Sequence, residues 1–161
     1  MRQSLFGIIM RLGASLALAG VVLLSMAGCI SAVQGASFQA GEDRLRAIPG
    51  VQSAAFTYTE LQQTLSSQTV LRVRVEAEPG NGSPTHLAEQ VARVAWAVGS
   101  KKPEGGISVT IETYPQVNYG LALKKKGWDF VTVGKPNPAL FVLSFRDASR
   151  TLGEWPGRPP D

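Results

Sequence analysis

The chain has 161 residues, of which 44% are hydrophobic and 17% charged, and its 16 Lys and Arg against 12 Asp and Glu give a formal net charge of +4. This length excludes a large multidomain enzyme, because one soluble domain commonly takes about 100–200 residues. The single cysteine excludes an intrachain disulfide framework and a zinc centre built from several thiolates.

The first 28 residues have the pattern of an export signal. Arg2 and Arg11 precede an uncharged apolar run, Ala14 to Met26, and small residues follow that run. A positive start, an apolar middle and a small-residue exit are typical of secretory signal peptides. We therefore predict that residues 1–28 are a signal peptide and that the rest of the chain lies outside the cytoplasm.

The exit of this segment, Met26-Ala27-Gly28-Cys29, resembles the lipobox of bacterial lipoproteins, in which an aliphatic residue and two small residues precede a cysteine. The resemblance implies that a signal peptidase recognises Met26, Ala27 and Gly28 and cuts before Cys29. It also implies that the Cys29 sulfur carries a diacylglycerol group with fatty chains such as palmitate. Two such chains anchor a protein stably, since each buried methylene contributes about 0.8 kcal/mol. The implied location is the outer surface of the bacterial cell membrane.

A second interpretation leaves the leader uncleaved. Residues 13–33 carry no charge, and about 20 apolar residues are enough for a membrane-spanning helix. Cys29 would then be an ordinary buried thiol. Both interpretations place the remainder of the chain outside, because Arg2 and Arg11 favour the cytoplasmic side.

A tether and one domain are predicted after the leader. Residues 29–40 carry no charge and are expected to form the tether, and residues 41–154 are expected to form a single domain. Glu42 to Ile48 predicts a short helix, which Pro49-Gly50 ends.

Two strands are expected next. Val51 to Leu61 alternates in a strand pattern that places Ala54, Phe56 and Tyr58 on one face, and the polar stretch from Gln62 to Gln68 predicts a loop. The second strand has apolar residues at every other position, namely Leu71, Val73, Val75 and Ala77, with Arg72, Arg74 and Glu76 between them. One face of this strand is therefore buried and the other lies in water.

A helix is predicted from Ser83, a suitable N-cap before Pro84, to about Val98, where Gly99 ends it. Its apolar stripe is expected to comprise Leu87, Val91, Val94, Ala95 and Val98, with a Glu89–Arg93 ion pair on the opposite side. Trp96 lies opposite that stripe. Either it is exposed for a partner, or the segment after Tyr114 covers it. We predict the second, because that segment must bury its own aromatic residues, Trp128, Phe130, Phe141 and Phe145.

The remaining elements complete an α+β pattern. A third half-buried strand is expected at Ile107 to Glu112. The other expected elements are a helix at Val117–Lys126, strands at Trp128–Val133 and Ala139–Phe145, a helical turn at Asp147–Leu152 and an irregular tail at residues 155–161. One-sided strands and amphipathic helices predict an antiparallel or mixed sheet with helices packed on one face, in the order helix-strand-strand-helix-strand plus a C-terminal extension.

This element order, with Ile48-Pro49-Gly50-Val51 at the first helix-to-strand corner, resembles BON domains of bacterial envelope proteins and, more loosely, ferredoxin-like modules. The resemblance covers residues 41–113. It implies adhesion to phospholipid or other envelope partners rather than chemistry. It transfers no functional residue.

Residues suited to catalysis are sparse. A hydrolase needs a nucleophile with a base, or a metal with its ligands. The chain has one histidine, His86, and neither a Gly-x-Ser-x-Gly elbow, a phosphate loop nor a cluster of metal ligands. We predict no catalytic residue, no cofactor and no metal. The alternative is a small envelope enzyme or enzyme accessory acting on cell-wall or lipid material, which would require a cleft that gathers Glu76, Glu78 or His86.

Two basic groups suit surface binding. One is Lys124-Lys125-Lys126, and the other is Arg72 with Arg74. Each cation near an acidic surface contributes about 1 kcal/mol, although a lysine run also serves simply as a solvated surface. Nucleic acid is not expected as a partner, because loss of Arg2 and Arg11 with the leader would lower the net charge of an exported chain from +4 to +2. We thus predict a membrane-anchored extracytoplasmic lipoprotein, a non-catalytic binding or structural module of the cell envelope, with membrane lipid at Cys29 and an envelope protein or wall polymer as partners.

Overall fold

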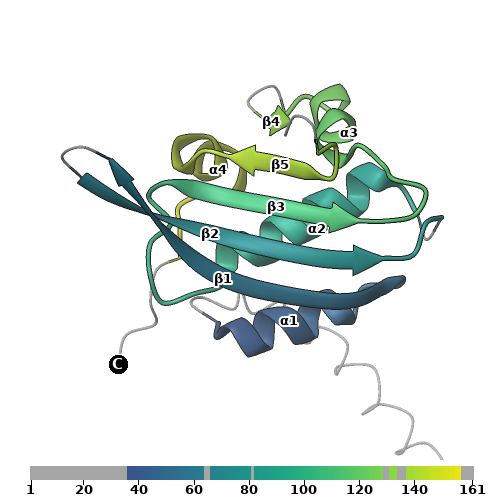
Figure 1. Cartoon of the computed structure of the whole chain (residues 1–161), viewed down its shortest axis with the longest axis horizontal. Helices are drawn as coiled ribbons and strands as arrows, with labels where there is room; N and C mark the ends of the chain where they lie inside the picture. The colour runs from purple at the N-terminus through teal and green to yellow at the C-terminus, as the bar shows by residue number, and fades with distance from the viewer. Residues whose placement is uncertain (1–35, 64–65, 81, 129–130, 134–136, 157–161) are drawn as a thin grey trace, which may run out of the picture. The chain divides into compact units, whose positions relative to one another are not determined.

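A five-stranded mixed sheet carries helices on one of its two faces (Figure 1). The computed structural model describes residues 36–63, 66–80, 82–128, 131–133 and 137–156, which belong to one compact unit, residues 32–161. The elements are α1 (Phe38–Arg46), β1 (Val51–Gln63), β2 (Ser66–Ala77), α2 (Pro84–Ala97), β3 (Gly106–Glu112), α3 (Tyr119–Lys125), β4 (Thr132–Val133), β5 (Leu140–Leu143) and α4 (Phe145–Leu152). The predicted α+β class, with helices against an open sheet, is confirmed.

The strand order in the sheet is β1-β2-β3-β5-β4. β2 and β3 are parallel, and the other neighbouring pairs are antiparallel. A parallel pair needs a crossover connection, and α2 supplies it between β2 and β3. The C-terminal segment adds β5 and β4 beyond β3, so it belongs to the same sheet as the first half of the domain.

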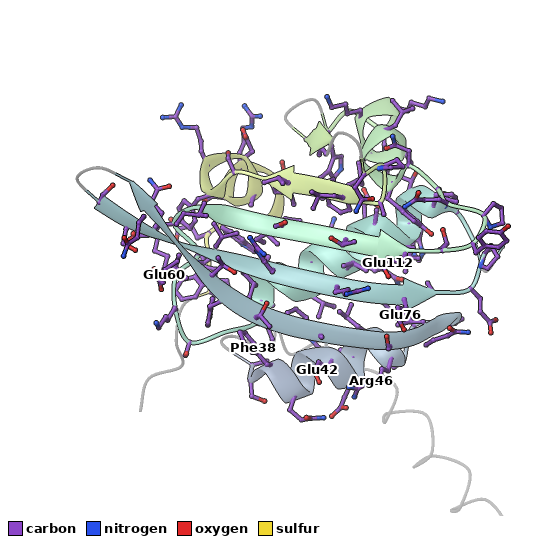
Figure 2. All side chains as sticks on the ribbon, in the orientation of Figure 1. Phe38, Glu42, Arg46, Glu60, Glu76 and Glu112 are labelled. Atoms are coloured by element: carbon purple, nitrogen blue, oxygen red, sulfur yellow. The ribbon has the colours of Figure 1, made fainter. Side chains whose placement is uncertain are left out.

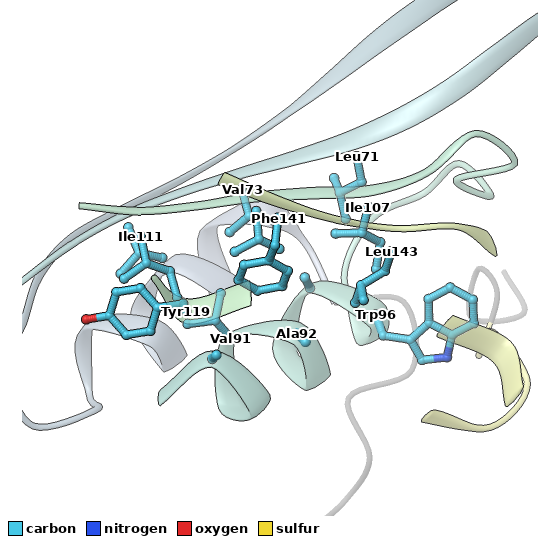
Figure 3. Packing of buried hydrophobic residues seen from close by; sticks show 14 of the residues in the cluster. Leu71, Val73, Val91, Ala92, Trp96, Ile107, Ile111, Tyr119, Phe141 and Leu143 are labelled. Atoms are coloured by element: carbon cyan, nitrogen blue, oxygen red, sulfur yellow. The ribbon is translucent and has the colours of Figure 1, made fainter. Parts of the chain in front are cut away.

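The core lies between this sheet and its helices. Leu71, Val73 and Val75 are buried on β2, while Arg72, Arg74 and Glu76 are exposed, as the alternation predicts. Figure 3 shows the buried strand side chains directed toward α2. The largest fully buried side chains of the described residues are Phe141, Leu45, Leu71, Ile107, Ile111, Leu123 and Leu143.

Helix α1 begins within the segment that the sequence assigns to the tether. The hydroxyl of Ser37 caps the helix by accepting a hydrogen bond from the backbone N–H of Ala40. The Phe38 ring packs against Phe56 and Tyr58, with centroid distances of 5.7 and 5.0 Å. The tether expected at residues 29–40 therefore ends too late in the prediction. The helix begins at Phe38 because its ring packs on the sheet. Residues 29–35 lie outside the described residues.

Strands β1 and β2 continue past the sheet as a two-stranded arm, Glu60–Gln63 paired with Ser66–Thr69. The predicted loop from Gln62 to Gln68 is wrong, since pairing extends to Gln63 opposite Ser66. Hydroxyl groups hold the arm together: Ser67 and Thr69 donate hydrogen bonds to the Glu60 carboxylate at 3.0 and 3.1 Å. β3 begins at Gly106, opposite Val70, so the arm has no third strand beside it (Figure 1).

The buried face of helix α2 matches the predicted stripe only in part, since Val91, Ala95 and Val98 are buried as predicted. Its buried residues are Ala88, Val91, Ala92, Ala95 and Trp96. Leu87 and Val94 are only partly buried. The alanines, not the longer aliphatic side chains, mark the centre of the buried face, which lets the helix lie close to the sheet. The predicted partner of Glu89 also differs, because its carboxylate lies 2.6 Å from Lys126 Nζ on the end of α3 rather than pairing with Arg93.

The C-terminal segment covers Trp96, as predicted. The Trp96 side chain is only 3% exposed, its Nε1–H donates a hydrogen bond to the Gly153 carbonyl at 3.1 Å, and its ring lies 5.4 Å from that of Phe145. Phe145 is the first residue of α4, not the end of a strand, because Ser144 caps that helix. The expected strands Trp128–Val133 and Ala139–Phe145 are accordingly shorter, Thr132–Val133 and Leu140–Leu143. Phe130 lies outside the described residues.

Replacing Trp96 with Phe is expected to lower the free energy of unfolding by about 1–3 kcal/mol, because the hydrogen bond to Gly153 is lost while most of the apolar volume stays. Chemical denaturation measures this difference. Trp155→Phe is the matched control, since Trp155 is only partly buried. Equal losses in the two variants would contradict the role of this hydrogen bond in holding the C-terminal segment.

Candidate functional site: the open face of the sheet

None of the helices that the structure describes covers the second side of the sheet, and we call this side the open face. Its members alternate with the buried residues: Ser53, Ala55 and Thr57 on β1, Arg72, Arg74 and Glu76 on β2, Ser108, Thr110 and Glu112 on β3, and Leu140 and Val142 on β5. Figure 2 shows this side of the sheet toward the viewer, with Glu76 and Glu112 labelled. Small residues thus lie on β1 at one side of the open face, charged and hydroxyl residues on β2 and β3 at its centre, and aliphatic residues on β5 at the other side.

Arg74 is held by an ion pair across the parallel strands. Its Nη2 lies 2.9 Å from Oε2 of Glu112, and this hydrogen bond raises the pKa of Arg74. Glu112 is the register partner of Glu76, so two carboxylates stand side by side. Like charges at neighbouring positions repel, and Arg74 offsets that repulsion. Ser53 donates a further hydrogen bond to Glu76 at 2.8 Å.

Arg72 has no such partner. Among the described residues, no carboxylate lies within ion-pairing distance of it, and its register neighbours are Thr57 on β1 and Ser108 on β3. A guanidinium group offers five N–H donors in a planar fork that suits carboxylate and phosphate. The row Thr57-Arg72-Ser108 therefore presents hydrogen-bond donors to an anionic group in solvent.

The aliphatic side of the open face adjoins this row. Val142 is the register partner of Ser108, and Leu140 is the partner of Thr110. Both side chains are partly buried rather than covered. A ligand that spans β2, β3 and β5 would meet a cation, hydroxyl groups and a small apolar surface in succession.

The lysine run predicted for surface binding lies elsewhere. Lys124 and Lys125 end α3 and Lys126 follows it, and all three are exposed. Lys126 is paired with Glu89 of α2, so α3 packs on the helical side of the sheet. The structure does not bring these lysines together with Arg72 and Arg74.

A shallow depression of about 410 Å³ lies beside His86. It is lined by Ser83, Thr85, His86, Ala122, Lys125 and Lys126. None of these lining residues is a carboxylate. Glu76 and Glu78 are exposed on β2 and its end, where they accept hydrogen bonds from Ser53 and Gln52. The cleft that the enzyme alternative requires, with glutamates gathered near His86, is therefore not formed by the described residues.

Two carboxylates have partners that the sequence pattern does not reveal, Glu112 on the open face and Glu60 in the arm. Glu112 ends the predicted third strand, but only the parallel register of β2 and β3 shows that it binds Arg74. Glu60 was not singled out, although hydrogen bonds from Ser67 and then Thr69 lower its pKa. No local pattern carries either pairing, because both depend on which strands are neighbours.

The predicted lipidation site cannot be placed on this geometry. Met26, Ala27, Gly28 and Cys29 lie outside the described residues, as does the whole apolar segment 13–33. Within the part of the chain that is described, no helix has the length and apolar character needed to cross a membrane. The same residues contain no group of three or more metal-binding side chains.

Comparison with protein-family models, with curated proteins and with solved structures gave no match. The resemblances to the lipobox and to BON domains therefore stay predictions from the residues quoted for them.

Proposed function

We propose that this chain is a membrane-anchored lipoprotein of the bacterial cell envelope, attached through Cys29 and acting as a non-catalytic binding module. Its ligand is an anionic component of the envelope, such as an acidic protein surface or wall polymer, which the open face binds. Arg72 forms the principal contact with this ligand. Arg74 and the neighbouring hydroxyl groups position the ligand on the open face.

The observation that carries the proposal is the exposed guanidinium of Arg72 on the open face, which has no ion-pair partner among the described residues. Of the two arginines, Arg74 is occupied by Glu112 at 2.9 Å. Arg72 is exposed between Thr57 and Ser108. An exposed cation flanked by hydroxyl groups favours binding of an anion, because a guanidinium offers five hydrogen-bond donors and no acceptor.

Site-specific photo-crosslinking in native membranes tests the proposal. A photoreactive residue at Thr57, beside Arg72, is expected to capture an envelope component, and Arg72→Ala is expected to reduce that capture severalfold. Arg93→Ala is the matched control, because Arg93 is an exposed arginine on α2, away from the open face. Raised salt should weaken capture as well, since screening acts on exposed charges.

Two results would count against the proposal. Equal capture by the Arg72→Ala and unsubstituted chains would show that the Arg72 guanidinium takes no part in binding. Gln39 is exposed on α1. If a photoreactive residue there captured as much as one at Thr57, the envelope component would not bind preferentially to the open face.

A further inference from the structure

The point at which the tether enters the domain is defined by backbone contacts. Ala36 forms a parallel bridge with Val98 at the end of α2, and its carbonyl accepts a hydrogen bond from the N–H of Gly99 at 2.9 Å. Two residues later, Phe38 packs against Tyr58. The chain therefore joins the domain at the C-terminal end of α2, beside the middle of β1.

The arm (Glu60–Gln63 with Ser66–Thr69) lies at this same end. The Tyr58 hydroxyl donates to the Lys101 carbonyl at 3.1 Å and accepts from the Lys101 N–H at 2.9 Å, which joins the arm's base to the loop after α2. Lys101 Nζ also lies 3.6 Å from the Glu60 carboxylate. From Glu60 to Gln63 the strand advances about 10 Å at ~3.3 Å per residue, so the arm extends past the point where the tether enters.

The lysines of α3 lie at the other end of α2. The hydroxyl of Thr85, the second residue of α2, lies 3.5 Å from the Ala122 carbonyl of α3. Helix α2 has 14 residues and is therefore about 21 Å long at 1.5 Å per residue. This length separates Lys124 and Lys125 from the entry of the tether.

The tether is short compared with the domain. Residues 29–35 are all that separates Cys29 from Ala36, and this segment spans about 24 Å when fully extended and roughly 15 Å as a flexible coil. We infer that this short connection holds the domain with the arm and the loop after α2 against the lipid surface, and with the lysines of α3 directed away from it. The inference rests on the proposed anchor at Cys29.

The chemistry of the arm end suits a headgroup layer. Leu61 is 43% exposed there, and the Glu60 carboxylate is bound by two hydroxyl groups and faces Lys101. Lys101 and Lys102 are exposed beside the arm, where cations meet anionic headgroups favourably. The lysine run of α3 is then available to envelope components beyond the membrane rather than to the lipids that hold the anchor.

Fluorescence quenching on vesicles tests the inference with the full acylated protein. Because the thioether occupies the sulfur of the single natural cysteine, one introduced cysteine provides a unique thiol for a fluorophore. The vesicles are phosphatidylcholine with a minor fraction of nitroxide-headgroup lipid. The label at Gln62→Cys, on the arm, is expected to be quenched severalfold more than the label at Lys125→Cys. A second pair of labels, at Glu104→Cys near the arm and at Gln116→Cys after β3, repeats the comparison in case one variant misfolds. Both positions are exposed, and the label at Glu104→Cys is expected to be quenched more.

The outcomes separate this inference from the proposal on which it rests. Equal quenching at the two ends, or stronger quenching at Lys125, in protein that floats with the vesicles would overturn the orientation and leave the anchor intact. Protein with a free Cys29 thiol that fails to float would overturn the anchor and the orientation together. A flexible Gly-Ser insert after Gly35 is expected to diminish the difference between the two ends, and an unchanged difference would show that the short tether does not orient the domain.

Discussion

Replacing Val73 with Asp is expected to unfold the domain under conditions in which the unsubstituted chain is folded. Val73 is 2% exposed at the centre of β2, and its register partners are Phe56 and Val109. The described residues include no buried polar or charged side chain near it, so a carboxylate there would have neither counter-ion nor donor. The expected loss is about 4–5 kcal/mol or more, most of the ~5–15 kcal/mol that stabilises an ordinary domain.

Thermal unfolding followed by circular dichroism measures the effect. Thr57→Asp is the matched control, because it places the same residue in a strand on the open face, opposite Arg72. That variant is expected to lose no more than about 1 kcal/mol, the range of strand propensities. A Val73→Asp variant as stable as the Thr57→Asp variant would show that the two faces of the sheet are wrongly assigned.

Replacing Cys29 with Ala is expected to abolish lipid attachment. Under the lipobox interpretation the sulfur is the acylated atom, so the variant should leave the detergent phase on phase separation and accumulate as a precursor or a released form. Ser31→Ala is the control, because it leaves the four lipobox residues intact. Folding of residues 36–156 should be unaffected, since the core cluster of the domain is built from residues within that range.

Mass spectrometry of the unsubstituted protein separates the two interpretations of the leader. A chain that begins at Cys29 and carries fatty acyl groups supports the anchor. An intact Met1 with an unmodified Cys29 thiol, together with unchanged partitioning of the Cys29→Ala variant, would favour the uncleaved membrane helix at residues 13–33.

The predictable parts of the fold are those in which the pattern of apolar residues within one segment shows which side chains are buried. The strict alternation from Leu71 to Ala77 placed Val73 in the core and Arg72 on the open face, and both placements are confirmed. Trp96 was predicted to be covered by the C-terminal segment, and it contacts Phe145 and Gly153. In each case burial of apolar area favours a single arrangement.

Other features depend on partners distant in the sequence. Ser37 is a suitable N-cap for a helix that starts at Phe38, but the packing of the Phe38 ring on Phe56 and Tyr58, which makes this segment part of the domain, is not visible locally. The arm looks like a loop because its residues are polar, yet hydrogen bonds to Glu60 stabilise it as paired strands. The buried face of α2 is only partly predictable because alanine carries a weak hydropathy signal, although Ala88 and Ala92 are fully buried.

The same distinction applies to the candidate site. Exposure of Arg72 and Arg74 follows from the alternation, but the difference between them does not. Only the parallel pairing of β2 with β3 gives Arg74 the Glu112 carboxylate and leaves Arg72 without one. The separation of Lys124–Lys126 from both arginines likewise follows from the packing of α3 on α2.

The contact between Trp96 and the Gly153 carbonyl has a consequence for how the chain matures. α4 follows β5 in the chain, so a nascent chain that has emerged only as far as β5 still lacks both Phe145 and Gly153 against the indole. Incomplete chains expose apolar surface that attracts aggregation and chaperones. A premature stop codon before residue 145 therefore yields a product in which neither contact covers the Trp96 indole, whereas a chain that includes α4 buries it.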